Sequence, residues 1–136
     1  VAVTVLTSLD ASDLSDLGVV AQPTAHAQRL ARLAFDQGVR AFVCSPEEVS
    51  AVRRELGPQA TLITPGVRPE APGAPLAGDA PTRDDQKRVA TAREAIARGA
   101  DYVVVGRPIR DAADPVSAAA SLDQSLRDAL AETRRA

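Results

Sequence analysis

The chain has 136 residues, a formal net charge of −2 and a sequence pI near 5.4. This length supports one domain with a hydrophobic core, whereas a complete eight-stranded α/β barrel needs roughly 250 residues. The balanced charge and the 2% aromatic content argue against a nucleic-acid partner, because neither a basic stripe nor stacking side chains are available. The sequence has no apolar run of about 18 residues and a single cysteine, so we expect no membrane association, no disulfide framework and a cytoplasmic location.

The start of the chain already has the pattern of a buried strand, over residues 1–6. The sequence contains no methionine, so we expect it to be part of a longer protein. A short helical region over 9–17 follows and ends at Gly18. The segment 23–37 has apolar residues on one helical face and is predicted to be a helix that ends before Gly38.

The middle of the chain repeats the same alternation. Residues 40–44 predict a second strand, with Cys44 as a small buried residue at its end. Ser45, followed by Pro46 and by Glu48, has the pattern of a capping box with proline at the first helical position, so a helix is expected from there to Leu56. Residues 60–64 predict the third strand.

The last part begins with a long loop rich in Pro, Gly and Asp over 69–85. Thr91 and the glutamate three residues later form a second capping-box pattern, for a helix that ends at Gly99. Residues 101–105 predict the fourth strand, and Asp114 precedes a terminal helix that begins with proline.

The predicted order is β-α-α-β-α-β-α-β-α, within one domain over 1–136. Strands that are apolar throughout and separated by helices indicate an α/β fold, with a parallel sheet covered on both faces.

Two of the predicted strands end in turns that contain glycine, proline and an arginine. Gly66 and Arg68 follow the third strand, and Gly106 and Arg107 follow the fourth. Glycine lets the backbone approach an anion closely, and a guanidinium can bind two phosphate oxygens at once. Because the carboxyl ends of parallel strands meet at one edge, these turns predict a phosphate site.

These turns also belong to a set of segments that resembles the C-terminal half of bacterial-type orotidine 5'-phosphate decarboxylases. The segments occur in the family's order and lie at predicted strand ends. They are Val3-Thr4-Val5-Leu6-Thr7-Ser8, Val43-Cys44-Ser45-Pro46-Glu47, Thr64-Pro65-Gly66-Val67-Arg68-Pro69, Asp85-Gln86-Lys87-Arg88-Val89 and Gly99-Ala100-Asp101-Tyr102 with Val105-Gly106-Arg107-Pro108-Ile109.

The resemblance implies a TIM (β/α)8 barrel, of which residues 1–136 form the last four β/α units, a phosphate-binding half-barrel. It implies the conversion of orotidine 5'-phosphate to UMP and CO2 in pyrimidine biosynthesis, without metal or organic cofactor, by a homodimer. The implied substrate-binding residues are Thr7 at the pyrimidine, Arg68 and Gln86 on the loop after the seventh strand, and Gly106 and Arg107 at the phosphate.

Two features depart from the family. Its catalytic Asp-x-Lys-x-x-Asp array has no counterpart here, because the only lysine, Lys87, is followed by Ala90 where the second aspartate would stand. We therefore expect no catalytic residue in this chain. The loop over 69–85 is also longer than the family's usual connection.

Several alternatives remain open. The chain could belong to another phosphosugar-binding barrel enzyme, or be a half-barrel that binds phosphate without catalysis. Thr7 could only satisfy backbone groups at a strand end, Arg68 could be a surface charge, and the turn at Arg107 could be solvated. The acidic residues Asp10, Asp13 and Asp16 are expected to mark a helix start rather than a metal site.

Overall fold

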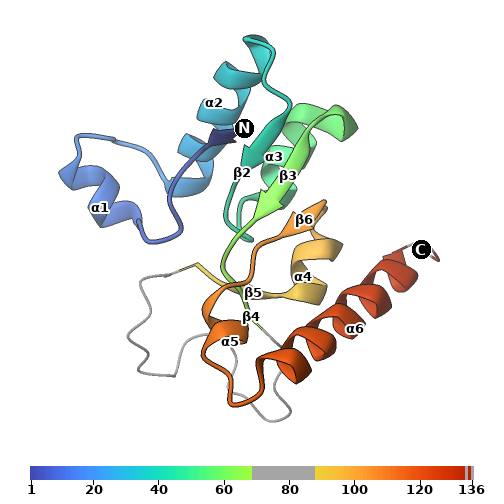
Figure 1. Ribbon diagram of the computed structural model, residues 1–136. Helices are drawn as coiled ribbons and strands as arrows, with labels where there is room; N and C mark the ends of the chain where they lie inside the picture. Colours follow the sequence, from blue (N-terminus) through green and yellow to red (C-terminus); the bar gives the residue numbers. More distant parts are fainter. Residues whose placement is uncertain (69–87, 134, 136) are drawn as a thin grey trace.

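The computed structural model describes residues 1–68, 88–133 and 135 (Figure 1). The helices are α1 (Ala11–Asp16), α2 (Pro23–Asp36), α3 (Val49–Leu56), α4 (Ala92–Ala97), α5 (Arg107–Arg110) and α6 (Pro115–Thr133), and a 3₁₀ turn covers Gly57–Gln59. The strands are β1 (Ala2–Val3), β2 (Ala41–Val43), β3 (Thr61–Thr64), β4 (Val67–Arg68), β5 (Ala90–Thr91) and β6 (Tyr102–Val103). In the described part, no helix is both long and apolar enough to cross a bilayer.

Within the described residues, the main sheet contains the four predicted strands in the order β1-β2-β3-β6, all parallel. This confirms the α/β class with a parallel sheet. The ladders are shorter than the apolar runs, since β1 ends at Val3 and β6 at Val103. A second small sheet, β4 with β5, was not predicted.

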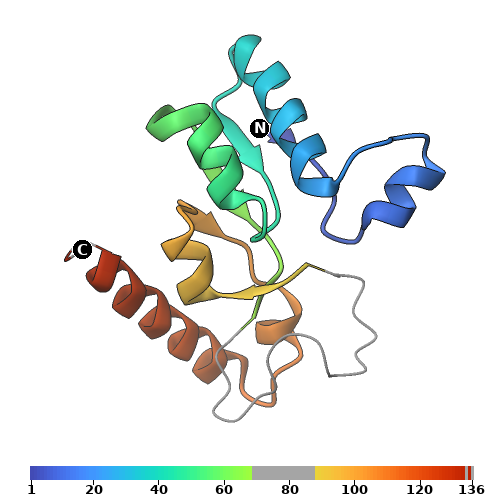
Figure 2. The same ribbon diagram turned by 180° about the vertical axis from the view of Figure 1, so that it is seen from behind.

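The core lies on one face of the main sheet, where α2 and α3 pack (Figure 2). Phe42 of β2 and Leu62 of β3 are neighbours in register and fully buried against Val49 and Val52 of α3. Burial of side chains of this size contributes about 1.5–3 kcal/mol each, so this layer supplies much of the stability of the fold. Helix α6 packs along α4 and contributes Leu122 to the same core (Figure 1).

The opposite face of the sheet is apolar, and no described helix covers it. Val3, Val43, Ile63 and Tyr102 occupy one row across the four strands. Val3 is 56% exposed and Tyr102 is 63% exposed. The prediction that both faces are covered was therefore wrong for the described residues, because α2 and α3 pack on the same side of the sheet.

Two predicted helix starts are confirmed by their caps. The Thr91 hydroxyl accepts a hydrogen bond from the Glu94 amide, and the Glu94 carboxylate accepts one from the Thr91 amide. Asp10 and Asp13 form the same reciprocal box at α1, so these two acidic residues do mark a helix start.

The predicted start of the third helix was wrong. Helix α3 begins at Val49, and the residues that follow Ser45 form a turn instead of a first helical turn. The Glu48 carboxylate does accept a hydrogen bond from the Ser45 amide, as in a capping box, at 2.9 Å. The same carboxylate also binds Arg88, and Glu48 is the N-cap residue, just outside the helix.

Candidate functional site

The carboxyl ends of β3 and β6 are neighbours, and most of the predicted phosphate residues follow them. The Val104 amide donates to the Thr64 carbonyl oxygen at 2.9 Å, which continues the β3–β6 ladder. Arg68 follows β3 at the end of β4, and Arg107 follows β6 as the first residue of α5; both are half-buried. Gly106 is exposed. The two arginine-bearing segments therefore leave the sheet from one edge, side by side.

Thr7 follows β1, the strand on the opposite side of the sheet from β6. It is half-buried in the turn after β1. In the strand order β1-β2-β3-β6, three interstrand spacings separate β1 from β6. At about 4.8 Å each, they amount to about 14 Å. Thr7 and Arg107 therefore follow the two outermost strands of the main sheet, β1 and β6. Gln86, the fifth predicted ligand, lies outside the described residues.

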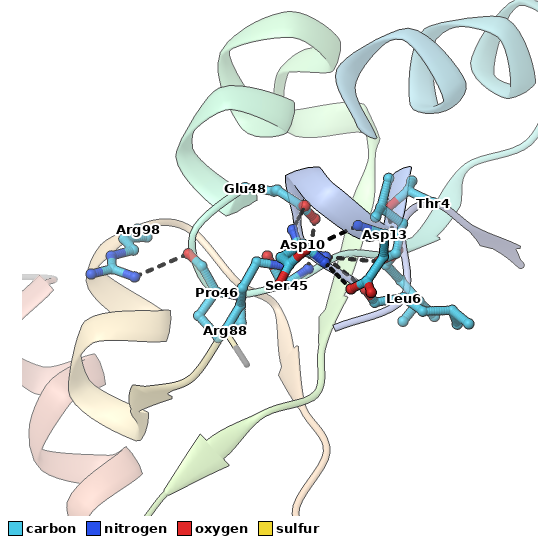
Figure 3. Close-up of polar contacts among 11 residues, drawn as sticks. Thr4, Leu6, Asp10, Asp13, Ser45, Pro46, Glu48, Arg88 and Arg98 are labelled. Atoms are coloured by element: carbon cyan, nitrogen blue, oxygen red, sulfur yellow. Dashed lines mark hydrogen bonds and ion pairs between the residues drawn. The ribbon is translucent and has the colours of Figure 1, made fainter. Parts of the chain in front are cut away.

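Sequence reasoning missed a buried ion pair at the same edge, between Arg88 and Glu48 (Figure 3). The Arg88 guanidinium also donates from Nη2 to the Leu6 carbonyl oxygen at 2.8 Å, and Leu6 precedes Thr7 directly. Both charged side chains are buried. The only signal in the sequence was that each lies within or beside a segment shared with the family.

The environment of Glu48 combines opposing effects. Burial raises the pKa of its carboxyl above the ordinary value, while the Ser45 amide and the Arg88 guanidinium oppose this shift. The Arg88 guanidinium thus gives the buried carboxylate a cationic partner, which offsets part of the cost of burying it.

Cys44, next to this pair, is buried as predicted. Burial raises the pKa of its thiol to about 12, and the Glu48 carboxylate acts in the same direction. Because only the thiolate is a strong nucleophile, we expect no reaction with a thiol reagent at pH 8 until the chain unfolds. Labelling in the native state at the rate of free cysteine would contradict this expectation.

The same shift predicts a pH dependence of stability. An unfolded thiol loses its proton near roughly pH 8.5, while the folded Cys44 keeps it. The unfolded state therefore binds fewer protons above that pH, and the free energy of unfolding should fall by about 1.4 kcal/mol per pH unit towards pH 12. Urea unfolding from pH 8 to 10.5 measures this slope, and Cys44→Ala should lack its contribution. Parallel curves for the two proteins would rule it out.

The described residues contain no group of three or more His, Cys, Asp or Glu side chains placed to hold a metal ion. An open hollow of about 390 Å³ lies between residues 18–21 and the first half of α2, where it is lined by His26 and Arg29. None of the predicted site residues lines it. The candidate site is thus the carboxyl edge of the sheet.

The sequence matches the family described as Orotidine 5'-phosphate decarboxylase / HUMPS over residues 1–122. An orotidine 5'-phosphate decarboxylase from Anaeromyxobacter sp. (strain K) is 52% identical over 125 residues, which are 92% of this chain and 51% of the relative. One from Enterobacter sp. (strain 638) is 44% identical over 126 residues, 93% of this chain and 48% of the relative. The chain thus spans about half the length of these curated relatives.

Solved structures agree with the sequence matches. The crystal structure of orotidine 5'-phosphate decarboxylase from Lactobacillus acidophilus has a TM-score of 0.68 and 28% identity, covering 91% of this chain and 47% of that protein. The enzyme from Sulfolobus solfataricus, at 18% identity and a TM-score of 0.56, supports the fold alone. The family resemblance of the five segments is confirmed: the chain belongs to the orotidine 5'-phosphate decarboxylase / HUMPS family.

Proposed function

We propose that this chain is the phosphate-binding, C-terminal half of an orotidine 5'-phosphate decarboxylase. The observation that carries the proposal is the adjacency of β3 and β6, which brings the segments with Arg68 and Arg107 to one sheet edge. In a family whose relatives are named for this substrate, two neighbouring arginine segments at strand ends suit a phosphate dianion.

The proposed roles divide along the sheet edge. Gly106, Arg107 and Gln86 would hold the phosphate, Arg68 would support it from β4, and Thr7 would hydrogen-bond the pyrimidine. The amide of Gln86 carries both a donor and an acceptor, as a bridge between base and phosphate requires. Binding energy from the phosphate, which does not react, would then stabilise the transition state at the pyrimidine.

The open sheet supports a half-barrel. Four parallel strands with helices on one face and an uncovered apolar row on the other are what half of a (β/α)8 barrel would present. We propose that four further β/α units complete the barrel and supply the Asp-Lys-Asp array. The complete enzyme would act in pyrimidine biosynthesis as a cytoplasmic homodimer.

The chain alone is expected to show no measurable decarboxylation of orotidine 5'-phosphate, since without the lysine array no cation stabilises the developing carbanion. A fusion of residues 1–136 behind the first half of the Anaeromyxobacter sp. relative should restore CO2 release. Turnover by the chain alone, in a preparation shown to be free of host enzyme, would disprove the first expectation.

The same fusion distinguishes the proposed function from its alternatives. A fusion that decarboxylates a sugar phosphate but not orotidine 5'-phosphate would indicate another phosphosugar enzyme. A folded fusion that binds UMP without turnover would indicate a non-catalytic phosphate-binding unit.

The uncovered face leads to a separate expectation for the isolated chain. Val3, Tyr102 and Val104 are more than half exposed, and the described strands leave β1 and β6 with one free edge each. Free edges and apolar faces promote association. We expect the chain to self-associate at tens of micromolar in sedimentation experiments, and Tyr102→Arg to weaken this association. A monodisperse monomer that unfolds cooperatively would contradict it.

A further inference from the structure

The ion pair of Arg88 and Glu48 lies at the proposed site, yet none of the proposed substrate contacts uses it. Arg88 lies shortly before β5, and Glu48 immediately precedes α3. Both side chains are buried, so neither belongs to the surface that would meet a substrate. Their other contacts therefore indicate what the pair does.

These contacts join the segments that follow β1 and β2 (Figure 3). Arg88 Nη2 donates to the Leu6 carbonyl oxygen at 2.8 Å and, more weakly, to that of Val5 at 3.5 Å. Glu48 Oε2 accepts from the Ser45 amide at 2.9 Å, while its Oε1 binds Arg88. One guanidinium thus connects the backbone beside Thr7 to the turn after β2.

A third connection runs through β5. Arg88 stands two residues before Ala90, whose amide donates to the Gly66 carbonyl oxygen at 3.2 Å. Strand β5 then pairs with β4, where Thr91 is the register partner of Arg68. The backbone that holds Arg88 is therefore the same backbone that holds the Arg68 segment.

The energetics favour a geometric role over a stabilising one. A buried ion pair costs a large desolvation penalty, and apolar side chains of similar volume often replace such a pair without loss of stability. In the described part of the chain, Arg88 Nε is buried without a hydrogen-bond partner, so this pair is not arranged for maximal stability. Its distinctive contribution is the fixed distance between three segments.

We propose that Arg88 and Glu48 are positioning residues, which hold the Thr7 turn at a fixed separation from the Arg68 segment. This inference rests on the proposed function, because it assigns the base contact to Thr7. It predicts that loss of the ion pair weakens the contact between Thr7 and the pyrimidine of the substrate.

The decisive variant replaces both members, as Glu48→Leu with Arg88→Met, in the fusion described above. This variant removes the buried charges and should fold. We expect its kcat/KM for orotidine 5'-phosphate to fall about 10–100-fold, as for a misplaced contact. The loss should be similar for orotidine without phosphate, since the base contact is affected. Arg88→Lys keeps the charge but not the forked geometry, and should recover only part of the activity.

A second measurement does not depend on activity. In the chain itself, amides of residues 5–8 should exchange hydrogen about tenfold faster in the double variant, while amides of β2 and β3 should not change. The control replaces the exposed Arg93–Glu132 pair in the same way and should alter neither readout. If the unmodified fusion has no decarboxylase activity, the proposed function fails, but the exchange experiment still decides the positioning role.

Two outcomes would overturn the inference. A double variant with unchanged kcat/KM and unchanged exchange at residues 5–8 would show that the pair positions nothing. Exchange that accelerates equally over the whole chain would show a general structural role.

Discussion

Replacing Arg107 by alanine in the fusion enzyme is expected to cost about 2–4 kcal/mol of transition-state stabilisation, obtained from the fall in kcat/KM for orotidine 5'-phosphate. This is the scale of a lost charge-assisted contact to a dianion. Arg107 begins α5 directly after Gly106, at the edge where β3 and β6 meet. Steady-state kinetics measure the effect. Because the phosphate does not react, both kcat and KM should change if its binding energy stabilises the transition state.

The substrate without its phosphate provides the internal control. For orotidine, Arg107→Ala should change kcat/KM very little, since the lost contact is absent from that substrate. Arg110→Ala is the matched variant, because Arg110 ends the same short helix and pairs with Asp111 on the surface. It should leave kcat/KM within about twofold. Equal losses on both substrates for Arg107→Ala would show a structural role instead.

Replacing Glu48 by alanine is expected to lower the free energy of unfolding by about 3–5 kcal/mol, since it leaves the Arg88 charge buried and unpaired. The Ser45 amide loses its acceptor in the same step. Chemical denaturation at neutral pH measures the loss. This result is compatible with a stable Leu/Met double variant, because breaking a buried pair and replacing it have different costs.

The exposed pair of Arg93 and Glu132 is the control for this effect. Both side chains are exposed to solvent, at 41% for Arg93 and 60% for Glu132. Glu132→Ala should therefore change the free energy of unfolding by no more than about 1 kcal/mol. If Glu48→Ala were equally mild, the Arg88–Glu48 contact would not persist in solution.

Local patterns in the sequence were sufficient to predict the alternation of strands and helices and the parallel sheet. The caps at Asp10 and Thr91 were readable because both partners lie within three residues of each other. The glycine and proline turns likewise identified Arg68, Gly106 and Arg107 as residues at strand ends, and the structure places their segments side by side. Their contacts to a substrate, and those of Thr7 and Gln86, remain predictions.

Contacts between distant residues decided the rest. Helix α3 begins at Val49 instead of at Pro46, and the carboxylate of its N-cap residue Glu48 binds a guanidinium 40 residues further along the chain. The same arginine reaches the Leu6 carbonyl oxygen across 82 residues. The periodic patterns of helices and strands relate only residues a few positions apart, so they could not indicate these contacts. The sequence alone therefore determined the four strands of the main sheet, the helices between them and the family that the chain resembles. Only the tertiary structure decided the small β4–β5 sheet and how the strand ends are held together.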